Sequence, residues 1–212
     1  MNDVAGYFAL TGTPVGAMTP VVTSAMLGRI AKGYSIAGQY GHLSDDVLGY
    51  NAFGASVSMP VSGFSLGGSL GFMSPSAQGA KSNMMLGLNA ETNLGAWALS
   101  DGKNANLFTM SARGEFGWAN PDQSGLLSFS AQVPFALVIK SGDMTFAPFV
   151  TPGFGWGRVS PTGANSVSGT RFMTGAGLGL SHRNGWGVSL GMQKVFIDQG
   201  KTAFGLNLSY GI

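Results

Sequence analysis

Along most of the chain, from Tyr34 onward, large apolar residues alternate with small or polar ones. The last segment is the clearest case, and its large apolar positions are Phe204, Leu206, Leu208, Tyr210 and Ile212. The positions between them hold Ala, Gly, Asn and Ser. Since successive side chains of a β-strand point to opposite faces, this segment has one apolar face and one small, polar face. The alternation therefore predicts β-strands.

Ten segments with this pattern follow one another, separated by residues typical of turns. We expect strands near residues 34–42, 48–61, 64–73, 83–96, 106–118, 126–139, 144–158, 168–182, 186–196 and 202–212. Alternating segments of about ten residues are the signature of transmembrane barrel strands, and single-chain bacterial barrels have even strand numbers. The predicted fold is all-β, a closed antiparallel up-and-down transmembrane β-barrel of about ten strands over residues 34–212.

The predicted connections differ in length. The second, sixth and eighth are tight, over residues 60–63, 141–143 and 183–185, and the last of these contains the Asn-Gly pair that hairpins favour. The third, fifth and seventh are mostly longer. Barrels of this type place short turns at the periplasmic end and longer loops outside, so we assign the ends accordingly. The fourth connection, residues 100–105, is longer than this rule expects.

The composition supports a surface that faces lipid. Only 9% of the 212 residues are charged, 11 Lys and Arg and 9 Asp and Glu, whereas a typical soluble domain has about 25%. A soluble β-sandwich, the main alternative, would need far more charge on its outer face. The net charge of +2 comes from scattered residues, so we expect no nucleic-acid partner.

Several further classes are excluded. The chain has no cysteine, which excludes disulfides and thiolate metal sites. It has no run of about 18 apolar residues, which excludes a membrane-spanning helix. The N-terminus lacks a basic region followed by an apolar one, so we expect a processed or recloned form if the protein is exported.

The tryptophans fall near the ends of the predicted strands. Trp97 and Trp186 lie toward the predicted periplasmic end, and Trp118 and Trp156 toward the outer end. Aromatic residues at both membrane interfaces form the girdles of transmembrane barrels. We therefore predict that these four side chains form two such girdles.

The predicted lumen is lined mainly by Gly, Ser, Ala and Thr, with a small set of larger polar residues. These are Glu91, Arg113, Glu115, Arg171, Asn89 and Gln132, together with Asn93 and Gln193. Arg113 and Glu115 are two residues apart and so share a strand face. Buried charges need partners, and salt bridges across the lumen are the favoured interpretation. The alternative is a constriction that tunes ion passage, as charged rings do in pores.

The final segment resembles the C-terminal assembly signal of outer-membrane proteins, in which alternating apolar residues lead to a terminal aromatic residue. Tyr210 occupies the third position from the end, although the last residue here is Ile212. Residues 34–212 resemble the broad superfamily of small porin-like and adhesin-like outer-membrane β-barrels of Gram-negative bacteria. This resemblance implies a location in the bacterial outer membrane, contact with its lipid, and recognition by the barrel-assembly machinery.

Residues 1–33 belong to no predicted strand and form an N-terminal extension. An apolar, weakly helical stretch over residues 18–31 suggests a plug inside the lumen. Pro14, Pro20 and several Gly and Thr residues suggest a periplasmic leader instead. A helix inside the barrel would resemble the translocator of autotransporters.

The residues for catalysis are few. His42-Leu43-Ser44 resembles the His-x-Ser pair of outer-membrane lipid A deacylases, but Ser44-Asp45-Asp46 also fits a turn. His42 and His182 are the only histidines, and neither has a second histidine at metal-ligand spacing. We expect no enzyme activity, no metal and no cofactor, with a barrel-embedded lipid hydrolase as a remote alternative.

The sequence thus predicts an integral outer-membrane barrel that is structural or a narrow passive pore for ions and small solutes. The alternative is an adhesin, or a membrane-anchoring subunit with a partner protein in the cell envelope.

Overall fold

A computed structural model describes residues 34–43, 50–75, 82–99, 106–120, 124–161, 163, 165–196 and 202–211. The predicted extension over residues 1–33 and the predicted turn at residues 44–46 lie outside these ranges. The strands are β1 (Ser35–Leu43), β2 (Tyr50–Val61), β3 (Phe64–Pro75), β4 (Asn83–Ala98), β5 (Leu107–Ala119), β6 (Ser124–Gln132), β7 (Phe135–Ser141), β8 (Met144–Pro161), β9 (Val167–His182), β10 (Trp186–Val195) and β11 (Thr202–Gly211).

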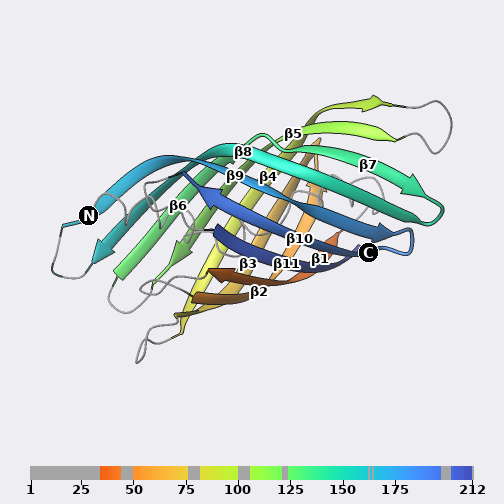
Figure 1. Cartoon of the computed structure of the whole chain (residues 1–212). Helices are drawn as coiled ribbons and strands as arrows, with labels where there is room; N and C mark the ends of the chain where they lie inside the picture. The colour runs from red at the N-terminus through yellow and green to blue at the C-terminus, as the bar shows by residue number, and fades with distance from the viewer. Residues whose placement is uncertain are drawn as a thin grey trace.

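The strands form one closed antiparallel ring (Figure 1). Apart from β6 and β7, consecutive strands pair with each other, and β1 pairs with β11 to close the ring. β6 and β7 lie end to end and together occupy the place of one strand in the ring, because both pair with β5 on one side and with β8 on the other. The ring therefore has ten positions, and the predicted ten-stranded up-and-down barrel is confirmed.

The predicted strand over residues 126–139 is interrupted at Val133 and Pro134, which separate β6 from β7. Proline has no N–H to donate to a ladder. Two bonds still cross the interruption at 2.9 Å each: the Ser111 N–H donates to the Pro134 carbonyl, and the Val133 N–H donates to the Pro152 carbonyl. The wall stays closed there, but its register is irregular.

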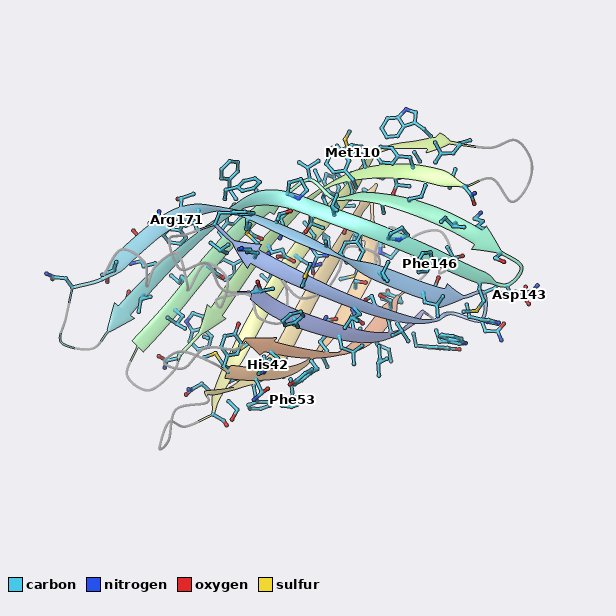
Figure 2. The ribbon with its side chains drawn as sticks, in the orientation of Figure 1. His42, Phe53, Met110, Asp143, Phe146 and Arg171 are labelled. Atoms are coloured by element: carbon cyan, nitrogen blue, oxygen red, sulfur yellow. The ribbon has the colours of Figure 1, made fainter. Side chains whose placement is uncertain are left out.

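The two faces of the ring differ as the alternation predicts. Large apolar side chains stand on the outer face, where Phe53 (Figure 2), Leu88, Phe154 and Leu190 are each more than half exposed. A water-soluble protein rarely exposes so continuous an apolar surface. This outer face therefore requires hydrocarbon around it. Within the described residues, no helix has the length and apolar character needed to cross a membrane.

Tight turns gather at one end of the ring, which we call the turn end. Between β2 and β3 the two residues of the turn, Ser62 and Gly63, have φ of 45° and 88°. Positive φ at both positions defines the hairpin turn whose twist matches that of the flanking strands. Other turns at this end include Gly142–Asp143 and residues 183–185. The predicted longer connections at the opposite end fall largely outside the described residues.

A ring of inward-facing apolar side chains lies toward the end of the barrel opposite the turns. Its members are buried and form one cluster that draws on β2 to β6 and β8 to β11: Tyr50, Ala52, Met73, Met85, Ala119, Leu126, Val159, Met173, Val195 and Ala203. Most of them lie within four residues of the strand end at this side of the barrel. This ring lines the lumen at that end with apolar groups.

Candidate functional site

A compact charge cluster occupies the inner wall at β4 and β5. Glu91 and Arg113 are cross-strand partners, and Glu115 follows Arg113 on the same face. Arg113 Nη2 lies 2.5 Å from Glu115 Oε1, and Arg113 Nη1 lies 3.9 Å from Glu91 Oε2. The three side chains are between 1% and 4% exposed. The structure thus brings together three of the residues that the alternation assigned to the lumen.

Neighbouring polar groups hold both carboxylates. The Ser111 hydroxyl donates to Glu91 Oε1 at 2.9 Å, and the Ser130 hydroxyl donates to Glu115 Oε2 at 3.0 Å. Gln132 Nε2 also donates to Glu115 Oε2, at 3.2 Å. Hydrogen bonds of this kind are what make a buried charge tolerable. Hydrogen bonds from neighbouring protein groups therefore hold both carboxylates of the cluster in place.

The other predicted lumen residues are more dispersed. Asn89 is half-buried, pairs with Glu115 across the strands, and lies over Gly67, where an added Cβ atom would require the Asn89 amide to move. Arg171 is half-exposed, and its Nη1 donates to the Thr170 carbonyl at 2.8 Å. Asn93 is exposed beside a register shift, and its Oδ1 accepts from the Gly95 N–H at 2.8 Å. Gln193 is buried on β10.

A second group of inward polar side chains was not singled out by the sequence. Gln39, Asn207 and Ser189 form one row, since Asn207 pairs with Gln39 of β1 and with Ser189 of β10. All three are buried, and among the described residues Gln39 Oε1, both amide atoms of Asn207 and Ser189 Oγ have no hydrogen-bond partner. In ring order, β11 stands opposite β5. Strand alternation placed these residues inward, but only the register makes them neighbours.

The aromatic residues of the predicted girdles all lie on the outer face or its rim. Trp97 and Trp186 lie toward the turn end, where the Trp97 ring is 5.8 Å from that of Phe108 and the Trp186 ring is stacked on His182 at 5.5 Å. Trp118 and Trp156 are half-buried, toward the opposite end. The structure therefore has a closed ring of strands with an apolar outer wall, a polar inner wall and aromatic residues toward both ends. The chain has the architecture of the bacterial outer-membrane β-barrels.

This architecture locates the barrel in the outer membrane of the bacterial envelope, where single-chain barrels with even strand numbers occur. In its last strand, Phe204, Leu208 and Tyr210 are about half exposed on the lipid-facing side. Leu206 is half-buried, and Ile212 lies outside the described residues. The barrel therefore presents the apolar side of its last strand outward.

Comparisons with known proteins find a likeness to solved structures only, at low sequence identity. No family model and no curated protein matches the chain. The β domain of the Bordetella autotransporter BrkA is 13% identical with a TM-score of 0.47, and the match covers 86% of this chain and 100% of that one. The outer-membrane enzyme PagL is 13% identical with a TM-score of 0.45, covering 84% and 99%. The KdgM porin is 12% identical with a TM-score of 0.36, covering 83% and 99%.

The candidate His-x-Ser pair is described only in part. His42 is half-buried at the end of β1 (Figure 2), and its Nδ1 lies 2.9 Å from Asn51 Oδ1. The Tyr40 hydroxyl donates to the same oxygen at 2.8 Å. Ser44 lies outside the described residues, so the geometry of the pair stays a prediction.

Proposed function

We propose that the protein is a structural barrel of the outer membrane whose lumen is closed to general diffusion. One observation carries the proposal: many of the polar side chains that face the lumen are buried. Examples from four strands, β6, β8, β10 and β11, are Ser130, Thr151, Ser189, Gln193 and Asn207, each 5% exposed or less. In an open aqueous channel, polar side chains on the inner wall would be exposed to water.

Two further features support a filled interior. The charge cluster is bonded within itself and to Ser111, Ser130 and Gln132, which favours the salt-bridge interpretation over an ion constriction. The apolar ring at the opposite end from the turns adds a barrier, since apolar constrictions resist wetting. Small barrels commonly fill their interior with side chains.

A narrow passive pore is the second candidate. Its support is the presence of two carboxylates, Glu91 and Glu115, on the inner wall, since acidic side chains that line a pore favour cations over anions. An adhesin or an anchoring subunit with an envelope partner also agrees with a closed lumen. A lipid hydrolase based on His42 and Ser44 stays a remote alternative, and loss of any esterase activity in His42→Ala and Ser44→Ala variants would be its test.

Single-channel conductance separates the first two candidates. The full chain is refolded into lipid, its folded state is verified by heat-modifiable gel mobility, and it is inserted into planar bilayers beside a general porin as positive control. We expect the compact form without discrete conductance steps at either polarity. Cation-selective steps that weaken in Glu115→Gln would overturn the closed barrel and establish the narrow pore.

A further inference from the structure

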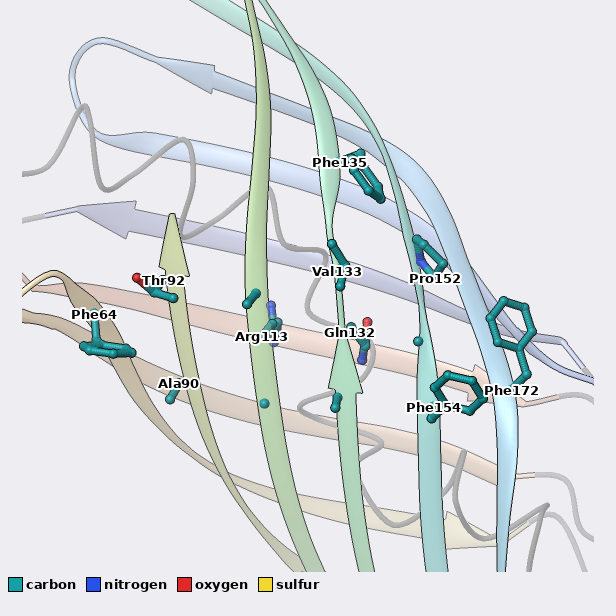
Figure 3. A pocket seen from close by; sticks show the side chains of 14 residues that line it. Phe64, Ala90, Thr92, Arg113, Gln132, Val133, Phe135, Pro152, Phe154 and Phe172 are labelled. Carbon is teal, nitrogen blue, oxygen red and sulfur yellow. The ribbon is translucent and has the colours of Figure 1, made fainter. Parts of the chain in front are cut away.

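The outer wall carries a groove of about 810 Å³ across β4, β5, β6 and β8. Figure 3 shows Phe64 at one side of the groove and Phe154 and Phe172 at the other, with the strands of the wall between them. Phe135 and Val133 border it where β6 gives way to β7. The groove thus lies over the irregular part of the wall.

The floor of the groove follows from the strand register. Ala90 pairs with Gly114, and Gly114 pairs with Ala131, so three adjacent strands present a methyl group or a hydrogen outward in one row. Thr92 and Ala112 form a second such pair beside it. Nearby outward positions carry large side chains, such as Leu88 and Phe116. Because adjacent strands are spaced about 4.8 Å apart, the hollow from β3 to β8 is roughly 19 Å long.

The rims of the groove are aromatic and its chemistry is apolar. The rings of Phe154 and Phe172 meet edge to face at 5.6 Å and close one side. The hydroxyl of Thr92 donates to the Gly63 carbonyl at 3.1 Å, so the hydroxyl hydrogen of Thr92 is not available to an occupant of the groove. The side chains of Arg113 and Gln132 are bonded within the charge cluster on the inner face. An occupant therefore finds few polar groups to bond.

We propose that this groove binds one acyl chain of a membrane lipid and holds it more firmly than the rest of the wall holds its neighbouring lipids. The surrounding outer face lies in hydrocarbon, so lipid acyl chains are in direct contact with the groove. If the hollow were empty, its lining atoms would lack dispersion contacts on that side. A flexible acyl chain that bends into the hollow provides these contacts. The convex wall of a second barrel, by contrast, does not fit a hollow bounded by phenylalanine rings.

The driving force is packing. Lipid tails are as apolar as the groove, so association inside a membrane depends on van der Waals contact, which a concave surface increases. The acyl chain also covers the segment where Val133 and Pro134 interrupt the strand. This site is independent of whether the lumen conducts, so it goes beyond the proposed function.

The groove can be filled without disturbing the backbone. A Cβ atom at Gly114 would have Ser130 O as its nearest neighbour, at 4.0 Å, so Gly114→Leu places a side chain in the hollow. Combined with Ala131→Leu, this variant fills the central row of the floor. Gly68→Leu is the matched control, since Gly68 lies on the outer face of β3 outside the groove lining and its Cβ would be 3.9 Å from Leu88 Cδ2.

The test is photolabelling of the refolded full chain in vesicles of a phosphatidylcholine that carries a diazirine in one acyl chain, with labelled positions mapped by mass spectrometry. We expect several-fold more label on the groove than on the outward residues Leu190 and Leu208. The filled variant should lose most of this excess, and Gly68→Leu should keep it. Heat-modifiable mobility verifies that each variant is folded.

Two outcomes would overturn the proposal. Uniform labelling around the wall would mean that the groove holds no lipid preferentially. Protection of the groove from label, together with a dimer that disappears in the filled variant, would mean that a second copy of the chain covers it.

Discussion

Replacing Arg113 with methionine removes the guanidinium that contacts Glu91 and Glu115 while keeping a long, unbranched side chain. Both carboxylates stay in a wall where their side chains are 4% and 1% exposed. Breaking a buried ion pair in this way costs about 3–5 kcal/mol, because the remaining charge is left uncompensated. We therefore expect Arg113→Met to lower the free energy of unfolding by about that amount.

Further substitutions should reverse the loss. Adding Glu115→Gln to Arg113→Met removes the closest uncompensated carboxylate and should recover part of the stability. Adding Glu91→Gln as well removes the last of the three charges. Replacing a whole buried ion cluster by neutral groups is often neutral or stabilising, so the triple variant should be more stable than Arg113→Met alone.

Urea unfolding of the refolded barrel in lipid vesicles, followed by tryptophan fluorescence, measures these differences. Arg171→Met is the control: this arginine also lies on an inward position but is half-exposed, and its loss should cost less than about 1 kcal/mol. The reasoning fails if Arg113→Met costs no more than Arg171→Met, or if the triple variant is the least stable of the series.

Three further predictions follow from single positions. Asn207→Leu should raise the free energy of unfolding by about 1 kcal/mol in the same assay, since neither amide atom of Asn207 has a partner in the described part of the chain; a clear loss would mean that the amide is hydrogen-bonded in the folded barrel. Ser62→Asn should stabilise the turn between β2 and β3 by about 0.5 kcal/mol, because asparagine tolerates the positive φ there, and Gly63→Ala should destabilise it. Tyr210→Ala should reduce the amount of barrel inserted in cells without preventing refolding in vitro; equal insertion would contradict recognition of the last strand by the assembly machinery.

The sequence predicts the faces of the strands well, because alternation is a local property. The inward placement of Glu91, Arg113 and Glu115 follows directly from counting every second residue. The interruption at Pro134 is not visible in that count, since the residues that face inward keep the same parity from Gln132 through Pro134 to Ala136. Alternation alone could not separate β6 from β7.

Neighbours across strands are harder to predict, because register depends on pairing between distant segments. The row of Gln39, Asn207 and Ser189 joins the first, last and second-last strands of the ring. The groove floor likewise needs Ala90, Gly114 and Ala131 to fall in one row. Each of these residues is unremarkable on its own strand, so neither feature is recognisable before the register is known.

The groove and the charge cluster are two faces of one piece of wall. Gly114 stands between Arg113 and Glu115 on β5, so two charged, inward-facing residues flank an outward-facing glycine. Arg113→Met acts on the inner face and Gly114→Leu on the outer one. If the backbone between them is rigid, their effects on the free energy of unfolding should add to within about 0.5 kcal/mol, as for independent sites. An interaction above about 1 kcal/mol in the double variant would mean instead that the irregular wall shifts as a unit, and that occupancy of the groove is coupled to the charge cluster.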